Sequence, residues 1–150
     1  MNNYFEEAIK LAKNGVKNKE GGPFGAVVVD NKGRIVGYGN NQVLKNNDPT
    51  AHAEVTAIRD ACKKLNTYDL SECKIYTTSE PCPMCLGAII WSNIKEVYYA
   101  TSRKDVDKIG FRDEDIYDYL EGKNNKIIKL EKIEDDKCEK LLDSYKNTIY

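Results

Sequence analysis

Apolar residues recur at helical spacing in the first segment of the chain. They are Phe5, Ala8, Ile9, Leu11, Ala12 and Val16. This spacing is typical of an amphipathic helix with one buried face. Gly15 lies near the end of the pattern, where glycine commonly stops a helix. The pattern predicts a first helix over residues 3–16.

Two β-branched runs separated by a turn follow this helix. Residues 24–30 are mostly apolar and rich in valine, and residues 34–39 contain isoleucine, valine and tyrosine. The intervening Asn31-Lys32-Gly33 supplies turn-forming residues, and two such runs joined by a short turn are typical of a β-hairpin. We therefore expect two antiparallel strands here.

Helix and strand patterns alternate in the middle of the chain. A helix is expected at about 51–65, with Val55, Ile58 and Ala61 on its buried face. Thr50 or Asp48 is expected to cap its N-terminus, because hydroxyl and carboxylate side chains accept hydrogen bonds from the first free amides of a helix.

A second helix is expected between two more strands. Residues 74–78 and 96–100 predict strands, and the Pro81-Cys82-Pro83 run is expected to open a helix that continues to Trp91, since proline is favoured in a first helical turn. Strands that alternate with helices after a hairpin predict an α/β domain. Its mixed sheet is expected to have an antiparallel edge and parallel strands beyond it.

The last third of the chain is dominated by charge. Residues 113–121 and 133–145 have helical patterns, and the Lys- and Asn-rich residues 121–126 predict a loop. We found neither a repeat nor a linker, so residues 1–150 are expected to form a single domain. A domain of this length buries enough surface to fold without a metal or a disulfide. A metal bound to this domain would therefore indicate a catalytic role, because folding does not require one.

Composition excludes several classes of protein. Lys and Arg number 23 against 24 Asp and Glu, whereas a dedicated nucleic-acid binder usually has a basic surplus. The apolar run at residues 86–91 is far shorter than the ~20 residues that cross a bilayer. The first residues include acids and do not resemble a secretory signal. The odd count of five cysteines argues against a disulfide framework, so we expect a cytoplasmic protein with reduced thiols.

Two short motifs contain side chains that can bind a metal. His52-Ala53-Glu54 lies at the start of one expected helix, and Pro81-Cys82-Pro83-Met84-Cys85 lies at the start of another. The positive end of a helix favours thiolates, which are the form of cysteine that binds zinc. One histidine and two cysteines make three protein ligands, His52, Cys82 and Cys85. Three is the number found in catalytic zinc sites, where water or hydroxide fills the fourth position.

Glu54 is the candidate proton carrier of this site. It lies two residues beyond His52, close enough to face the same cavity without binding the metal. Zinc lowers the pKa of bound water toward about 7, so a neighbouring carboxylate can accept a proton from it and pass the proton on.

Each motif alone has a simpler interpretation. The Cys82/Cys85 pair is also the spacing of a thiol redox pair, and Cys62 or Cys73 would complete a structural zinc site with four ligands. His52 alone fits a capping or core histidine. Together the motifs match H-x-E…P-C-x-x-C, the signature of zinc-dependent nucleobase deaminases. Ligand type favours zinc, although iron also fits it.

Over most of its length the sequence resembles the cytidine deaminase superfamily, and within it the bacterial guanine deaminases. The resemblance lies in four segments, residues 21–27, 47–59, 80–89 and 110–113. The middle two are also similar to tRNA adenosine deaminases, whereas the last segment and the terminal Tyr150 resemble the guanine deaminases more specifically. The resemblance implies a three-layer α/β/α fold with a mixed central sheet of about five strands, and one Zn²⁺ per subunit.

The resemblance also implies roles for residues outside the metal site. Asn41 is expected to hydrogen-bond a purine edge, and Phe24 and Trp91 to line the base pocket. Asp113 is expected to help protonate the departing amino group, and Tyr150 to close the pocket. The alternatives are a turn residue at Asn41, core packing at Phe24 and Trp91, a helix cap at Asp113 and a frayed end at Tyr150.

The activity implied is hydrolytic deamination of guanine to xanthine and ammonia. Backbone amides near Ala53 and Cys82 are expected to orient the base. The family also implies a homodimer in which the C-terminal segment crosses to the neighbouring subunit. The alternatives are a tRNA adenosine deaminase, a cytosine or guanosine deaminase and, outside enzymes, a structural-zinc or thiol-redox module.

Overall fold

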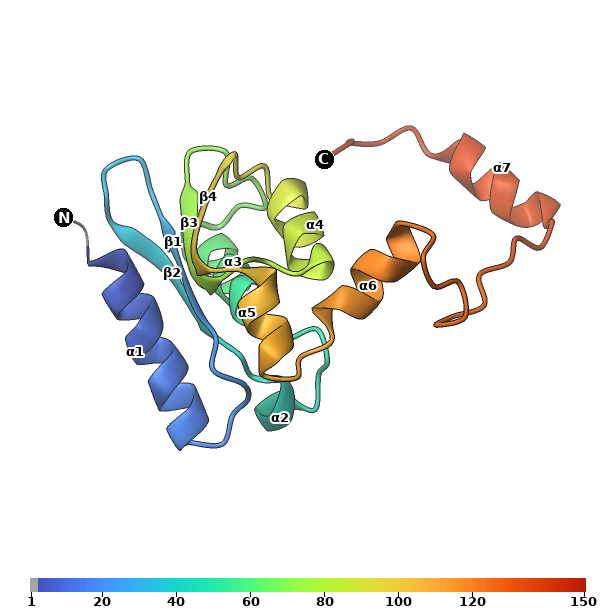
Figure 1. The fold of residues 1–150 in the computed structure, drawn as a ribbon. Helices are drawn as coiled ribbons and strands as arrows, with labels where there is room; N and C mark the ends of the chain where they lie inside the picture. The colour runs from blue at the N-terminus through green and yellow to red at the C-terminus, as the bar shows by residue number, and fades with distance from the viewer. Residues whose placement is uncertain (1–2) are drawn as a thin grey trace.

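A four-stranded mixed sheet forms the centre of the computed structural model, which describes residues 3–150 (Figure 1). The strands lie in the order β2-β1-β3-β4. They are β1 (Gly25–Val29), β2 (Ile35–Asn40), β3 (Lys74–Ser79) and β4 (Glu96–Thr101). β1 is antiparallel to both of its neighbours, whereas β3 and β4 are parallel.

Helices cover both faces of the sheet, which confirms the expected three-layer α/β/α arrangement (Figure 1). The longer ones are α1 (Tyr4–Lys17) on one face and α3 (Ala53–Leu65) and α4 (Pro83–Trp91) on the other. The remaining helices are α2 (Val43–Asn46), α5 (Arg103–Lys108), α6 (Asp113–Leu120) and α7 (Asp136–Ser144). α2 and α5 were not expected, because four and six residues are too few for a periodic pattern.

The sheet differs from the expectation in two respects. Only β3 and β4 are parallel, because the chain leaving β2 passes through α3 and enters the sheet on the far side of β1. The described residues form four strands where about five were expected. The reason is that the chain beyond α6 leaves the sheet and does not pair with β4.

Alternating side chains of the central strands build two cores. Ala26, Val28 and Ile75 point toward α3 and α4, and the core on that face includes Ile89 of α4. Val27, Val29 and Tyr76 point toward α1 and pack against its residues Tyr4, Phe5 and Leu11. This is the period of two that a strand imposes when both of its faces are covered, and it explains why β1 is buried along its whole length.

Small residues allow α3 to lie close to β2. The fully buried positions of α3 on the sheet are Ala53, Ala57 and Ala61, spaced four apart, whereas Val55 and Ile58 are only half-buried. A Cβ atom on Gly39 would collide with the carbonyl oxygen of Ala53, and one on Gly37 with that of Ala57. Glycine is therefore required on this face of β2, since a backbone atom cannot rotate away as a side chain can.

The start of α3 corrects the predicted cap. The carboxylate of Asp48 accepts hydrogen bonds from the backbone N–H (2.9 Å) and hydroxyl (2.7 Å) of Thr50, so it stabilises the preceding turn. The N-cap residue is His52, whose side chain makes no capping hydrogen bond. A cap with its side chain free of the helix amides remains available for another partner.

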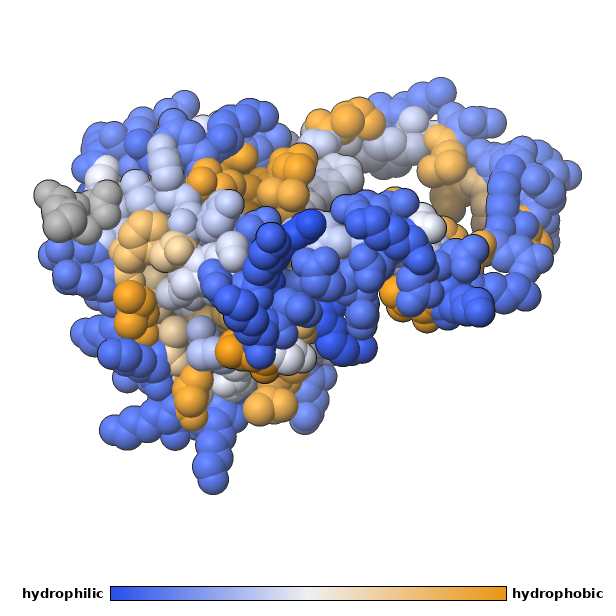
Figure 2. Space-filling model, in the orientation of Figure 1, coloured by the Kyte–Doolittle hydropathy of each residue, from blue (hydrophilic) through white to orange (hydrophobic). Residues whose placement is uncertain are grey.

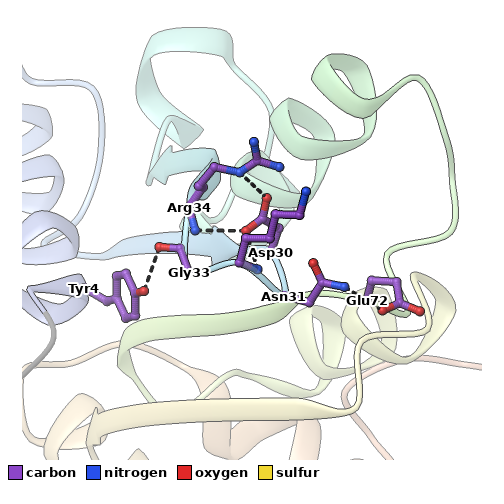
Figure 3. Close-up of polar contacts among 7 residues, drawn as sticks. Tyr4, Asp30, Asn31, Gly33, Arg34 and Glu72 are labelled. Atoms are coloured by element: carbon purple, nitrogen blue, oxygen red, sulfur yellow. Dashed lines mark hydrogen bonds and ion pairs between the residues drawn. The ribbon is translucent and has the colours of Figure 1, made fainter.

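The turn of the β1–β2 hairpin is held by side chains from three parts of the chain (Figure 3). Asp30 accepts hydrogen bonds from the backbone and Nε of Arg34, at 2.9 Å and 2.8 Å. Asn31 donates to Glu72 (3.0 Å), and the hydroxyl of Tyr4 donates to the carbonyl of Gly33 (2.8 Å). These bonds tie the hairpin to α1 and to the loop before β3.

The chain beyond α6 forms an arm that projects from the rest of the molecule (Figures 1 and 2). Every residue from 121 to 150 is exposed, although the arm contains large apolar side chains such as Leu130, Ile133 and Leu142. The arm includes α7, and the chain then turns back toward α4. Within residues 3–150, no helix combines the length and hydrophobicity needed to span a membrane.

The contact between α3 and β2 gives a stability prediction. Gly39→Ala should lower the free energy of unfolding by about 3 kcal/mol, because its Cβ meets backbone atoms of α3. Gly122→Ala is the matched control, since a Cβ there meets open space and only its left-handed φ of +77° is unfavourable. That strain is worth about 1 kcal/mol. Urea unfolding compares the two, and an equal or smaller loss for Gly39→Ala would contradict the close contact.

Candidate active site

α3 and α4 each begin at one residue of the predicted metal site. His52 is the N-cap residue of α3 and Cys82 is the N-cap residue of α4, and both have extended backbone. Pro83 occupies the first position of α4, where its missing N–H has no helical partner to lose. Cys85 follows within the same first turn. The positive ends of two helix dipoles therefore lie beside the same three side chains.

The three predicted ligands are close enough to hold one ion. His52 Nδ1 lies 3.6 Å from the Sγ of Cys82 and 3.5 Å from the Sγ of Cys85, and the three ligand atoms all lie within 4.8 Å of one another. Zn–S and Zn–N bonds at a tetrahedral angle separate sulfur and nitrogen by about 3.5 Å. The side chains thus fit tetrahedral zinc.

The two thiols share a proton unequally. A hydrogen bond from Cys85 and another from the neighbouring His52 hold the pKa of Cys82 well below its usual range, despite the opposing effect of burial. The same hydrogen bond to Cys82, followed by burial, raises the pKa of Cys85. The hydrogen bond with Cys82 also raises the pKa of His52. One thiolate is therefore preformed, and a cation bound between the sulfurs would replace the shared proton.

Glu54 is a buried carboxyl group beside this cluster. Its side chain is 6% exposed and is not one of the grouped ligands. Burial raises its pKa to about 7, although the backbone amide at the helix start favours the ionised form. A carboxyl group with a pKa near neutrality can both accept and donate a proton, which is what general acid–base catalysis requires.

A cavity of about 800 Å³ opens onto the cluster. Its lining is largely apolar, with Phe24, Met84 and Phe111 among the contributing side chains. His52, Glu54 and Cys82 also line it, so the cluster and the proton carrier face one space. Apolar walls with a few polar groups are typical of a small-molecule site.

Phe24 and Asn41, two of the residues predicted to bind substrate, both line this cavity. The ring of Phe24 packs edge-on against Phe111, with centroids 4.9 Å apart. Asn41 is 5% exposed, and its side-chain oxygen accepts a hydrogen bond from the N–H of Val43 at 3.1 Å. This bond fixes the orientation of the amide and leaves its NH₂ group as the donor available to a ligand.

Asp113 lines the cavity from the first position of α6. Its pKa is raised, first by burial and then by the negative charge of Cys82. Ala53 is fully buried at the start of α3, between His52 and Glu54, and is not among the residues that line the cavity. Asp113 therefore approaches the same space as Glu54 from a different element.

Trp91 and Tyr150 lie outside the cavity of their own chain. Neither is among its lining residues, and both are largely exposed. The ring of Tyr150 lies 6.0 Å from that of Trp91 and 6.0 Å from that of Tyr68. Within one chain the C-terminus thus rests against the outer side of α4, and the predicted pocket roles of both residues are not realised there.

Several cavity residues had no predicted role. Phe111 belongs to the segment 110–113 that the sequence singled out, and its neighbour Gly110 has a left-handed φ of +94°, so a signal existed for it. Some of the others lie on α2, on α6 or in the arm, where no spacing marks them: Leu44, Ile116, Tyr119, Ile127 and Ile128. Cys62 and Cys73 lie in or against the core on the α3 side and outside the metal cluster, which removes the four-ligand alternative.

Comparison with known proteins agrees with this geometry. Residues 1–101 match the family model of the cytidine and deoxycytidylate deaminase zinc-binding region. Guanine deaminase from Bacillus subtilis is 54% identical over 114 residues, which are 76% of this chain and 72% of that protein. The solved structure of the B. subtilis enzyme superposes with a TM-score of 0.89 and 42% identity, covering 100% of this chain and 99% of the other.

Two further relatives are more distant. The structure of guanine deaminase from Nitrosomonas europaea superposes with a TM-score of 0.69 at 34% identity, over 73% of this chain and 63% of the other. A tRNA-specific adenosine deaminase from Buchnera aphidicola subsp. Schizaphis graminum is 39% identical over 138 residues, which are 92% of this chain and 88% of that protein.

The metal site gives a direct prediction. Cys82→Ala should lose most of the bound zinc, because only two ligands remain. Cys138→Ser is the matched control, since Cys138 is an exposed cysteine of α7. This variant should retain a full complement of zinc. Atomic emission on the purified, dialysed proteins measures both. Normal zinc content in Cys82→Ala would contradict the assigned ligand.

Proposed function

The chain belongs to the cytidine and deoxycytidylate deaminase family, and from that membership we propose that it hydrolyses guanine to xanthine and ammonia. The observation that carries the proposal is the similarity to B. subtilis guanine deaminase over the whole length of the chain. The arm and α6 are part of that similarity. They contribute Asp113, Tyr119 and Ile128 to the cavity.

The charge around the cavity also favours a free base over a nucleic acid. Its lining contains the carboxylates of Glu54, Glu80, Asp113 and Asp115, against the single guanidinium of Arg112. Negative charge repels phosphates and does not repel a neutral base. A tRNA adenosine deaminase is the second candidate, and this balance disfavours it.

The residues divide the chemistry between binding and proton transfer. His52, Cys82 and Cys85 would hold zinc, which would act as a Lewis acid and lower the pKa of water toward about 7. Asn41 donates its NH₂ hydrogen bond to an acceptor on the purine edge, and Phe24 packs against the ring. Backbone amides at Ala53 and Cys82 orient the base with C2 toward the cluster.

Glu54 moves the protons of the reaction. It takes one proton from water and gives it to the ring nitrogen next to C2, while the water oxygen bonds to C2. The second proton, from the new hydroxyl group, goes to the amino group through Glu54 with help from Asp113. The bond between C2 and the amino nitrogen then breaks, the nitrogen keeps the electron pair, and ammonia leaves. The raised pKa values of Glu54 and Asp113 suit groups that must both accept and donate protons.

We further propose a homodimer in which the arm of each chain covers the cavity of its partner. The arm is exposed along its whole length and contains apolar residues that a single chain leaves uncovered. Tyr150 lies away from the cavity of its own chain, so its predicted pocket role requires the neighbouring cavity. Exposed apolar surface of this extent is typical of an interaction site.

Ammonia release tests the substrate. The zinc-loaded protein is offered guanine, guanosine, adenine, cytosine and a tRNA anticodon stem-loop in parallel, and release from guanine alone is expected. Release only from the RNA would replace guanine deamination with the second candidate. Release from none of them with zinc fully bound would overturn deamination of these substrates.

Glu54→Gln tests the proton carrier within the same assay. Its turnover of guanine should fall at least 10²–10⁴-fold, which is the usual contribution of a positioned acid–base group, while zinc content stays normal. The control is Glu6→Gln, the same change at an exposed position of α1, which should keep full activity. Substantial turnover by Glu54→Gln would remove the residue from the reaction.

Mixing two inactive chains tests the exchanged arm. A chain lacking Tyr150 has an intact metal site but a shortened arm, and the Glu54→Gln chain has an intact arm but no proton carrier. Coexpression should restore part of the activity, because mixed dimers contain one cavity with both intact parts. Each chain expressed alone is the control, and mixtures no more active than their separate sum would contradict the exchange.

A further inference from the structure

Arg103, the first residue of α5, contacts α6 at two points about one turn apart. Its Nε lies 3.3 Å from Oε1 of Glu114, and its guanidinium carbon lies 4.1 Å from the centre of the Tyr117 ring. Residues three apart share one side of a helix, so both contacts are on the same face of α6. A planar guanidinium can pair with a carboxylate and stack on a ring together, which an ammonium group cannot do equally well.

α5 is fixed to the loop that carries the first cysteine ligand. The backbone N–H of Arg103 donates to Oε1 of Glu80 at 3.1 Å, and Glu80 lies two residues before Cys82. The helix begins with a capping box at Ser102, and its residue Val106 is 3% exposed. Arg103 therefore extends from an element whose place relative to the metal cluster is set.

α6 has no buried anchor of its own. None of its residues is buried, and its N-cap residue Arg112 makes no side-chain capping bond. One further polar contact to the cysteine loop is the hydrogen bond from the Tyr117 hydroxyl to the carbonyl of Pro81, at a long 3.5 Å. The two contacts of Arg103 thus provide much of what orients this helix.

We propose that Arg103 is a positioning residue for the deamination, holding α6 in the rotation at which Asp113 faces the cavity. Asp113 directly precedes Glu114, so a rotation of α6 that breaks the ion pair also turns Asp113 away. Two fixed points about a turn apart determine both the distance of α6 from the cysteine loop and its rotation, whereas one point leaves the rotation free. The inference rests on the proposed function, in which Asp113 assists proton transfer to the leaving group.

A double-mutant cycle between Arg103 and Asp113 tests this inference. Arg103→Gln should lower kcat for guanine roughly 10-fold or more, since small displacements of catalytic groups are costly, and should leave KM and zinc content nearly unchanged. Asp113→Asn should lower kcat at least as much. The double variant should be no slower than Asp113→Asn alone, because Arg103 acts through a carboxylate that is already gone.

Two further variants keep the test independent of folding. Glu114→Gln removes only the ion pair and should reproduce part of the loss. Arg103→Lys should restore less than half of the lost kcat, because an ammonium group cannot pair with the carboxylate and stack on the ring at the same time as well as a guanidinium can. The matched control is Lys108→Gln, which removes a positive charge from an exposed position of α5 and should keep wild-type kcat. Thermal unfolding of each variant separates a kinetic effect from a loss of structure.

The possible results are distinct from those that test the substrate. Losses that multiply in the double variant, a full recovery by Arg103→Lys, or an Asp113→Asn enzyme with unchanged kcat would each overturn the positioning role. If the wild-type chain releases ammonia from another substrate of the panel, the assignment of guanine fails. The same cycle, run on that substrate, then decides the role of Arg103.

Discussion

The close contact between α3 and the glycines of β2 is the constraint on which the site depends. Because the helix packs through Ala53 and Ala57 onto backbone, its distance from the sheet is set by atoms that cannot move aside. His52 and Glu54 occupy the first turn of that helix. The backbone of the sheet therefore fixes the positions of His52 and Glu54, because no flexible side chain lies between the glycines of β2 and the backbone of α3.

Burial then determines what these groups can do. Glu54 has lost most of its water, and the ends of two helices partly replace the lost solvation. The cysteine pair is similarly shielded, which opposes ionisation, but hydrogen bonds from the neighbouring thiol and from His52 stabilise one thiolate. A metal ligand set and a proton carrier thus arise from the same arrangement of two helix starts around one apolar cavity.

The sequence allowed prediction of those parts of the site that are encoded locally. His52, Glu54, Cys82 and Cys85 lie within two short motifs at helix starts, where spacing brings the side chains of each motif together. The match of the two motifs to the deaminase signature predicted that they meet. Long-range features were beyond it: the pairing of β1 with β3 and the strand count depend on how distant segments cross. The cap of α3 was mispredicted because Asp48 satisfies Thr50 in the turn instead.

The absence of buried residues in α6 divides the cavity wall into parts of unequal local stability. Backbone amides of β1 lie between the two cores of the sheet, so they exchange with solvent only when the domain opens widely. α6 contains no buried residue, so a smaller local opening is enough to expose its amides. We therefore expect this wall of the cavity to open more readily than the sheet, which would let a ligand enter without displacing the metal-binding residues.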